Sequence, residues 1–247
     1  MKRFFLALRF LTVYPFGGDE EITTGDLTAS TLYYPIVGAI LGLILYWAWT
    51  LMQAVWPVFL ASALTVTLWV LLTAGLHLDG LMDTFDGLGV RGDRQRRLEV
   101  MRDSRVGSFG AQAAILVLFL KIAAVASLAA KPSFMPALIL APVAGRAAMV
   151  AYMAAGKYAR EGDGLGRAFI DGTGKGHLLL AVILFGILGF PAVGVLIVPA
   201  IVAQGAFFVL LRYFFNINFG GVTGDLLGAA CELHELVFML LVPLILR

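Results

Sequence analysis

The stretch TLYYPIVGAILGLILYWAWTLMQAVWPVFLASALTVTLWVLL, residues 31–72, decides the fold class. It lies within a run, residues 27–78, that contains no Asp, Glu, Lys or Arg. One membrane-spanning helix takes about 20 apolar residues, so this run has room for two. The dipeptide Trp56-Pro57 in its middle favours a turn. We therefore predict membrane-spanning helices over roughly 33–55 and 58–78.

A second uncharged run covers residues 176–211 and predicts two more spans, divided near Gly189-Phe190-Pro191. Three further apolar segments predict the remaining spans, at roughly 109–130, 134–155 and 226–246. The total is seven spans, with six as the alternative. The expected fold is thus an all-α, polytopic transmembrane helix bundle, and we treat residues 1–247 as a single integral membrane domain.

Composition agrees with this fold class. Hydrophobic residues make up 60% of the 247 positions and charged residues 14%, whereas soluble domains carry roughly 25% charged residues. The single cysteine, Cys231, excludes an internal disulfide and a cysteine-based zinc site. The first residues, MKRFFLALRFLTVYPF, are basic and apolar, but Arg9 interrupts the apolar run. We interpret them as a short amphipathic helix on the membrane surface, with Lys2, Arg3 and Arg9 directed towards lipid headgroups, and not as a signal peptide.

Basic residues are distributed unevenly among the predicted loops. The segments between the second and third spans and between the fourth and fifth are rich in Arg and Lys, whereas the opposite loops hold only Lys131. Because cytoplasmic loops carry the excess of basic residues, the N-terminus is expected in the cytoplasm. The acidic residues fall on the same side, so we expect an active site at the cytoplasmic face. We expect membrane lipid as a partner and no nucleic acid, and the 28 glycines would permit close packing in a homo-oligomer.

The most informative motif is GLHLDGLMDTFDG, residues 75–87. Its carboxylates are Asp79, Asp83 and Asp86, at positions i, i+4 and i+7, which share one face of a helix. Three like charges at a membrane helix end repel one another and are costly to desolvate. A cation would relieve both costs, and carboxylate oxygens suit Mg²⁺ or Mn²⁺. The simpler alternative is a solvated polar helix end.

A second polar segment, RQRRLEVMRDSRVGSFG, covers residues 94–110 and places Asp103 between Arg102 and Arg105. These three residues form either a plain ion pair or part of a phosphate-handling site, in which metal ions bridge phosphate oxygens and Arg neutralises the remaining charge. Arg146 within a predicted span and Arg160 in a glycine-rich loop are further candidates, because an intramembrane Arg is a functional hypothesis by default.

The segment GGVTGDLLGAACELHE, residues 220–235, opens the last predicted span. Asp225, Glu232 and Glu235 share a helical face there. Asp225 is either a helix N-cap or a catalytic group, and the two glutamates either reach the interface or serve the site. His77 precedes Asp79 by two residues and is either a proton carrier or an interfacial side chain. No two histidines have the spacing of zinc ligands.

These motifs resemble the adenosylcobinamide-GDP ribazoletransferase (cobalamin synthase) family. The resemblance rests on HLDGLMDTFDG, RLEVMRDSRVGSFGA and GGVTGDLLGA, in this order along nearly the whole chain. It implies a bacterial inner-membrane enzyme that joins α-ribazole, or its 5′-phosphate, to adenosylcobinamide-GDP. The products are GMP and adenosylcobalamin or its 5′-phosphate, and Mg²⁺ is required. The resemblance also carries over Asp79 as an essential acidic position.

Site roles follow as hypotheses. Asp79, Asp83, Asp86 and Asp103 are the candidate Mg²⁺ ligands, and Asp103, Asp225 and His77 compete as the base, with Asp103 ahead. The candidates for binding substrate and phosphate are Arg102, Arg105, Arg146, Arg160 and Glu232.

Three rival functions use the same acids. A cation transporter would use them as an ion path, although transporter sites lie near the bilayer midplane in repeated halves and no repeat is evident. A membrane prenyltransferase would carry an asparagine-led Asp motif, which is absent from the sequence. The CDP-alcohol phosphotransferases use a similar Asp cluster, but their full motif is also missing, so the similarity is one of chemistry.

Overall fold

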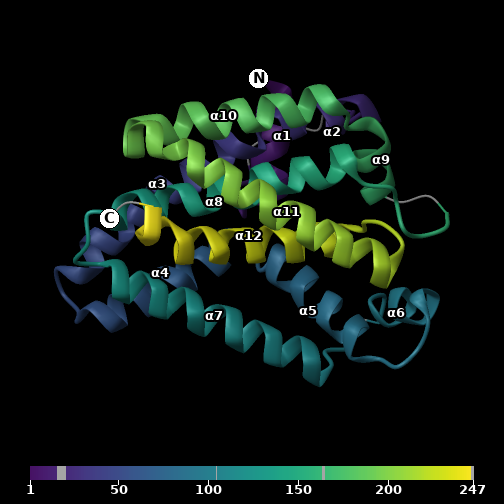
Figure 1. The fold of residues 1–247 in the computed structure, drawn as a ribbon, viewed down its shortest axis with the longest axis horizontal. Coiled ribbons are helices and arrows are strands. Elements are labelled where there is room, and N and C mark those ends of the chain that lie inside the picture. Colours follow the sequence, from purple (N-terminus) through teal and green to yellow (C-terminus); the bar gives the residue numbers. More distant parts are fainter. Residues whose placement is uncertain (16–20, 104, 163–164, 246–247) are drawn as a thin grey trace.

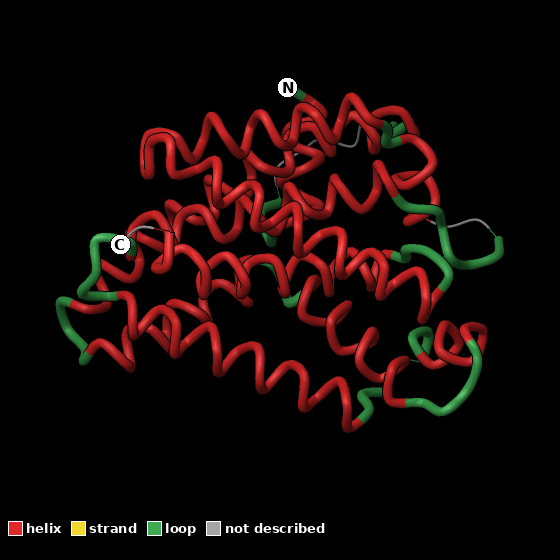
Figure 2. Tube along the Cα trace, in the orientation of Figure 1, coloured by secondary structure: helices red, strands yellow, loops and turns green. Residues whose placement is uncertain are grey.

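The computed structural model describes residues 1–15, 21–103, 105–162 and 165–245, and the described residues form a bundle of helices (Figures 1 and 2). The helices in chain order are α1 (Lys2–Leu11), α2 (Thr24–Ser30), η1 (Thr31–Tyr33), α3 (Tyr34–Gln53), α4 (Val58–Leu72), α5 (Leu76–Gly89), α6 (Arg94–Val100), α7 (Ser108–Leu128), α8 (Phe134–Ala155), α9 (Leu165–Gly172), α10 (Lys175–Val193), η2 (Gly194–Leu196), α11 (Ile197–Phe219) and α12 (Gly224–Ile245).

The all-α membrane class is confirmed. Within the described residues, five helical stretches are long and apolar enough to cross a membrane, and six if α4 and α5 together count as one broken span. One of the five is the 45-residue stretch Lys175–Phe219, in which α10 and α11 turn back on each other at η2 (Figure 1). The sequence predicts seven spans, with six as the alternative, and the structure supports up to six. The seventh span stays a prediction.

Two predicted boundaries differ from the structure. The division between the two spans is predicted near Gly189-Phe190-Pro191. In the structure, α10 ends three residues after Pro191, at Gly194, which has a φ of 57°. Pro191 instead lies inside the last turn of α10. A proline near a helix end marks the approach of the end, but the left-handed backbone of a glycine is what stops the helix.

The second predicted span, 58–78, is not continuous. α4 ends at Leu72 and α5 leaves it at an angle of 89°. Ala74 and Gly75 lie in the left-handed region with φ of 50° and 66°, which turns the chain within a few residues. The consequence is that α5, which carries the acidic motif, is a separate helix directed away from α4 towards α6 (Figure 1).

The predicted amphipathic helix is confirmed as α1, but its surroundings differ from the expectation. Its apolar side chains, among them Leu6 and Leu11, are buried against the rest of the chain. Lys2 and Arg3, expected to face lipid headgroups, both pair with Asp26 of α2. The helix therefore packs onto the bundle and contributes to its core.

α8 is the central helix, since most of its residues are buried inside the bundle. Small residues let other helices approach closely. In α3, Gly42 faces the backbone of Ile139, where an added Cβ would lie 2.2 Å from the carbonyl oxygen. Between α5 and α12, a Cβ on Gly80 would lie 2.7 Å from the carbonyl oxygen of Asp225, and one on Gly228 would lie 3.0 Å from that of His77. Both close contacts follow the small-residue rule for membrane helices.

The short helices and the connecting segments gather at the two ends of the bundle. α6, α9 and the start of α12 lie at one end, on the right in Figure 1, whereas the C-terminus and the α7–α8 turn lie at the other. The first end carries the Arg-rich segments that the charge pattern predicted to be cytoplasmic. The grouping agrees with the predicted sidedness, and the side of the membrane on which this end lies stays a prediction.

We predict that Gly80→Ala weakens the α5–α12 contact. Overpacking of this kind costs about 1–3 kcal/mol, although alanine raises intrinsic helix propensity. Gly205→Ala on α11 is the matched control, because its Cβ would meet open space. Thermal unfolding in detergent should show a lower midpoint for Gly80→Ala and an unchanged or higher one for Gly205→Ala. Equal midpoints would contradict the close crossing.

Candidate active site at the α5–α12 crossing

The three acids of the central motif all lie on α5. Asp79 is exposed near the start of the helix, and Asp83 and Asp86 are half-buried in the turns that follow. The structure thus places all three within one helix, as their spacing predicted. Their surroundings differ, and this difference separates their possible roles.

Asp86 is engaged by the start of α7. Its two carboxylate oxygens accept hydrogen bonds from the backbone N–H groups of Gly107 and Gly110, each at 2.8 Å. Both glycines approach so closely that an added Cβ would lie within 2.5 Å of an Asp86 oxygen. A carboxylate at a helix N-terminus satisfies amides that have no partner within the helix. The geometry therefore indicates that Asp86 holds α7 against α5.

Asp225 joins the cluster from α12. Thr223 accepts a hydrogen bond from the backbone N–H of Leu226 and so opens the helix. The Asp225 carboxylate accepts a hydrogen bond from the Arg160 guanidinium at 2.6 Å, and both side chains are largely buried. The expected alternative, in which Asp225 acts as a simple helix cap, does not describe this contact.

The glycines of the last motif explain how Arg160 reaches Asp225. Gly220 ends α11 with φ of 80°. Gly221 lies so close to Lys157 that a Cβ would be 2.2 Å from its carbonyl oxygen. The two loops are joined by backbone hydrogen bonds, from Val222 to Lys157 at 2.8 Å and from Ala159 to Val222 at 3.0 Å. This pairing holds the Arg160 loop against the start of α12.

The carboxylates act on one another. Asp83 experiences repulsion from Asp225, Asp79 and Asp86, and attraction from Arg160. Four acids from two helices thus repel one another at Asp83, and Arg160 is the one attractive charge among the main influences of the described residues on that carboxyl group. Within the described residues, however, no group of three or more Asp, Glu, His or Cys side chains is arranged to hold a metal ion by itself.

This donor set still fits Mg²⁺. Magnesium is usually bound by one or two carboxylates together with substrate phosphates and water, and not by a complete cage of protein ligands. Asp79 offers carboxylate oxygens beside a cavity, and Asp83 interacts with Asp79 and with Arg160, a cation that suits phosphate. A complete protein cage is therefore not required for the predicted chemistry.

Asp103 lies outside this arrangement. It is exposed on the α6–α7 loop, and its carboxylate forms a bidentate contact with Arg105, with the shortest distance 2.6 Å. The hydrogen bonds from Arg105 lower the pKa of Asp103 to about 2, and the same contact raises the pKa of Arg105. Arg102 is exposed beside them. A carboxylate with so low a pKa is a weak proton acceptor at neutral pH.

Two predicted substrate-binding residues lie deep in the bundle. Arg146 of α8 is fully buried and donates a hydrogen bond to Glu235 of α12. Lys121 of α7 donates to Glu235 and, at 2.7 Å, to Glu232. Two cations and two anions thus compensate each other, as buried intramembrane charges must. The structure places Arg146 and Glu232 in this buried charge network and not among the acids of α5.

The cavity beside the acids has a volume of about 260 Å³. Asp79, Asp225 and His77 line it together with apolar side chains of α1, α8 and α9. His77 is 1% exposed, and its Nε2 atom has no hydrogen-bond partner among the described residues. The histidine that sequence reasoning left ambiguous is thus a buried wall residue of the candidate site.

Sequence reasoning missed the contribution of α1 to the site. A second cavity, of about 540 Å³, also contains Asp79 and is lined by Arg9, Thr12 and Thr73. The guanidinium and the two hydroxyls are groups that bind phosphate. The signal in the sequence was the interruption of an apolar run by Arg9, which we had assigned to lipid headgroups.

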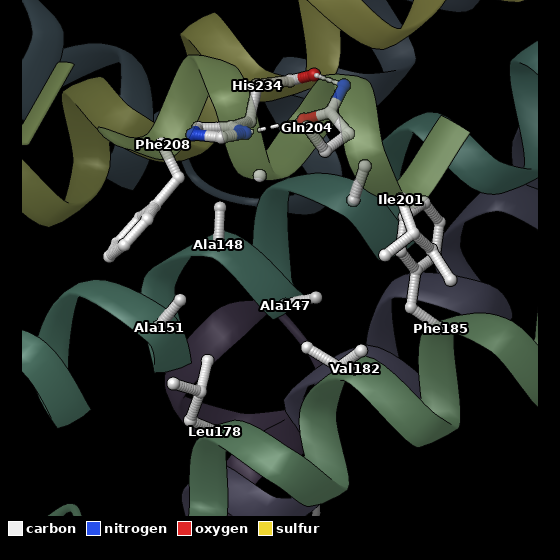
Figure 3. Close-up of a pocket in the computed structure, with 12 residues that line it drawn as sticks. Ala147, Ala148, Ala151, Leu178, Val182, Phe185, Ile201, Gln204, Phe208 and His234 are labelled. Atoms are coloured by element: carbon white, nitrogen blue, oxygen red, sulfur yellow. Dashed lines mark hydrogen bonds between the residues drawn. The ribbon is translucent and has the colours of Figure 1, made fainter. Parts of the chain in front are cut away.

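A third cavity lies between α8, α10 and α11 and differs in character (Figure 3). Its described lining is apolar and rich in alanine, and its polar members are Gln204 and His234. These two side chains bond to each other, as Figure 3 shows. No carboxylate is found among the described residues that line it, so it is not the candidate site.

Comparisons with known proteins agree with the resemblance in the motifs. The model of the CobS family, described as cobalamin-5-phosphate synthase, matches residues 3–243. An adenosylcobinamide-GDP ribazoletransferase of Clostridium acetobutylicum is 36% identical over 98% of this chain and 95% of its own. One of Pseudomonas syringae pv. syringae is 41% identical over 99% of this chain and 100% of its own. No solved structure matches the chain.

Apolar helices long enough to cross a membrane, with Asp79 and Asp225 beside a cavity, are typical of an integral membrane enzyme. The match of the family model over residues 3–243 and the identities to these relatives show which family of enzymes it is. The chain belongs to the CobS family and is a transferase of cobalamin biosynthesis.

We predict that Asp86 contributes mainly to the stability of the fold, by holding the start of α7 against α5. In Asp86→Asn, one of the two oxygens that accept the amide hydrogen bonds is replaced by an NH₂ group, and loss of a helix cap costs about 0.5–2 kcal/mol. Asp103→Asn is the control, because its side chain is exposed and its partner is a single surface Arg. Thermal unfolding should show a lower midpoint for Asp86→Asn and little change for Asp103→Asn. A stable, inactive Asp86→Asn would instead indicate a direct role in the reaction.

Proposed function

We propose that the acids at the α5–α12 crossing carry out the reaction named for the curated relatives, adenosylcobinamide-GDP ribazoletransfer. A ribose hydroxyl of α-ribazole, or of its 5′-phosphate, attacks the phosphorus bonded to the aminopropanol arm of adenosylcobinamide-GDP. The bond from this phosphorus to the bridging oxygen of the diphosphate breaks, and GMP leaves with that oxygen. The product is adenosylcobalamin or its 5′-phosphate, and the hydroxyl proton passes to a base.

The observation that carries this proposal is the incompletely compensated charge of the acids. The buried charge network of Lys121, Arg146, Glu232 and Glu235 matches two cations with two anions. The cluster around Asp83, in contrast, brings three further carboxylates close to that group, and among the main influences on Asp83 from the described residues only Arg160 is attractive. A site that keeps such an imbalance is suited to receive cations.

Asp79 and Asp83 are the proposed Mg²⁺ ligands, with Asp225 adjacent. Bound Mg²⁺ would neutralise the diphosphate and polarise its oxygens. The protein's own residues then supply position and charge, which is most of what phosphoryl transfer requires. Asp86 and Asp103, the two other acids we had predicted as ligands, are held by the α7 amides and by Arg105.

Arg160 is the proposed phosphate-binding side chain. It points its guanidinium at Asp225 in this structure, and a guanidinium offers five donors in a planar fork. One edge can remain on Asp225 while another binds phosphate. Asp225 would thus orient Arg160, much as a neighbouring carboxylate fixes a catalytic side chain. Arg9, across the neighbouring cavity, is a second candidate for the same anion.

Asp225 is also the proposed base. Of the three earlier candidates, Asp103 lies on an exposed loop and is not a lining residue of the cavity, and the Nε2 atom of His77 is buried. Asp225 is paired with an Arg as Asp103 is, but it lies at the cavity. Asp225 lines the cavity with Asp79, so a hydroxyl bound there would lie near both. A positioned carboxylate of this kind can contribute about 10²–10⁴-fold to a rate.

Sidedness, lipid contact and oligomeric state complete the proposal. The Arg-rich end of the bundle is placed in the cytoplasm of a bacterium by the positive-inside rule. Large apolar side chains exposed on three helices would face lipid, among them Phe119 on α7, Ile187 on α10 and Leu210 on α11. A homo-oligomer stays a prediction.

We predict that Asp79→Ala and Asp83→Ala each lower metal-dependent GMP release about 10²-fold or more, by analogy with the loss of transition-state charge stabilisation. Asp171→Ala is the control, because Asp171 is exposed on α9 and its contact with Arg167 is 3.9 Å long. GMP release by purified protein at several Mg²⁺ concentrations measures the effect. Full activity of both cluster variants, each shown to be folded, would disprove the metal assignment.

The base assignment predicts a contrast in pH dependence. Because the pKa of Asp103 is about 2, this carboxylate remains ionised from about pH 5 to 8 and Asp103→Asn should leave the shape of the pH–rate profile unchanged. Asp225→Asn should lower the rate by about 10²-fold or more and remove the acidic limb of the profile. If Asp103→Asn removes that limb instead, Asp103 is the base.

A further inference from the structure

The approximately 260 Å³ cavity at the α5–α12 crossing, hereafter the crossing cavity, is lined by both polar and apolar side chains. Asp79 and Asp225, where the proposed reaction takes place, are two of the polar ones. The apolar wall consists of side chains from α1, α8, α9 and α12, namely Phe10, Met149, Met153, Phe169 and Leu227. Phosphate chemistry makes no use of such an apolar wall, so the wall requires a separate explanation.

The wall has the composition of a site for a flat ring. Two aromatic side chains and two methionines lie together, and both types make favourable contacts with aromatic rings. Ligand pockets commonly occupy about 300–1,000 Å³, and the crossing cavity lies just below this range. It is too small for a corrin macrocycle with its side chains, and its size suits one bicyclic base.

His77 is the candidate for a polar contact with such a ring. Its Nε2 atom is buried without a hydrogen-bond partner in the described part of the chain, and the residue lines the crossing cavity. An unpaired buried donor is unfavourable, and a ligand with one acceptor would remove that cost. In the tautomer with hydrogen on Nε2, the imidazole donates a single hydrogen bond there.

We propose that the crossing cavity binds the benzimidazole-type base of the nucleoside substrate and that His77 recognises its free ring nitrogen. This inference rests on the proposed function, because it assumes a ribazole-type nucleoside as the attacking substrate. Such a base is apolar except for one unsubstituted ring nitrogen, which matches an apolar wall with one unpaired donor. Guanine, the base of the other substrate, carries a carbonyl, a ring N–H and an amino group, and burying these without partners is costly.

The placement also suits the reaction. Phe10, Phe169 and His77 line the same cavity as Asp79 and Asp225. The ribose of a base bound there would therefore lie close to the carboxylates beside which the diphosphate is proposed to bind. One cavity would thus fix the identity of the base and bring the nucleophile near the acids.

A first experiment tests the ring nitrogen. Equilibrium binding of two nucleosides to purified protein, without the corrinoid substrate, compares a dimethylbenzimidazole riboside with the dimethylindole riboside, in which carbon replaces the free nitrogen. Wild type should bind the indole compound about 10-fold more weakly. His77→Leu should bind both nucleosides equally, and His77→Gln, which keeps a donor, should retain a preference for the benzimidazole compound. A full preference in folded His77→Leu would overturn the role of His77.

A second experiment measures a gain in binding of a larger nucleoside, which a misfolded variant would not show. Phe169→Ala enlarges the crossing cavity and should bind a tricyclic naphthimidazole riboside at least 10-fold better than wild type does. Phe185→Ala is the matched control, since Phe185 is equally buried but lines the third cavity between α8, α10 and α11. The same gain in Phe185→Ala, or none in Phe169→Ala, would overturn the assignment of the cavity.

The two experiments also separate this inference from the proposed function. Absence of nucleoside binding to wild type would overturn the base site, whatever the chemistry of the acids. Normal nucleoside binding without metal-dependent release of GMP would overturn the proposed reaction and leave the base site standing.

Discussion

The site depends on the close crossing of α5 and α12. Gly80 and Gly228 remove the side chains that would keep the two helices apart, and each faces backbone of the other helix. The contact brings Asp225 beside the acids of α5, although like charges oppose the approach. Van der Waals packing of small residues is a main source of helix association in membranes, and here it must outweigh that repulsion. The bundle therefore holds the acids together before any cation is bound.

The two groups of charges in the bundle are compensated differently. Lys121, Arg146, Glu232 and Glu235 form a closed set far from solvent, and Lys121 also lies over the ring of Trp69 at 4.3 Å. Such a set ties α7, α8 and α12 to one another at a fixed register. At the crossing, Asp83 is repelled by three other carboxylates, and Asp79 and Asp225 line a cavity. Of the two groups, the incompletely compensated one is the group suited to bind cations and phosphate.

Broken and paired backbone segments give the site its shape. The 89° bend between α4 and α5 turns the acidic helix out of line with the preceding apolar helix. The pairing of the Lys157–Ala159 loop with Val222 places Arg160 against α12. Asp86 fixes the start of α7 to α5. Each device relies on backbone groups, which explains why glycines are frequent around the site.

The sequence by itself determined the membrane class, most helix positions and the identity of the acidic motif. These properties depend on local composition: long uncharged runs demand helices in lipid, and i, i+4, i+7 spacing fixes a shared face whatever the neighbours are. The span at residues 134–155 is a direct example, because α8 has these bounds.

Tertiary structure alone decided which charged residues face each other. Arg146 and Arg160 were equal candidates in the sequence, yet one lies against Glu235 in the core and the other against Asp225 at the site. Asp86 and Asp103 were both candidate ligands, and their partners are amides of α7 and a neighbouring Arg. The physical reason is that charge pairing depends on distances between residues far apart in the chain, which helix crossings set and one-dimensional spacing does not contain.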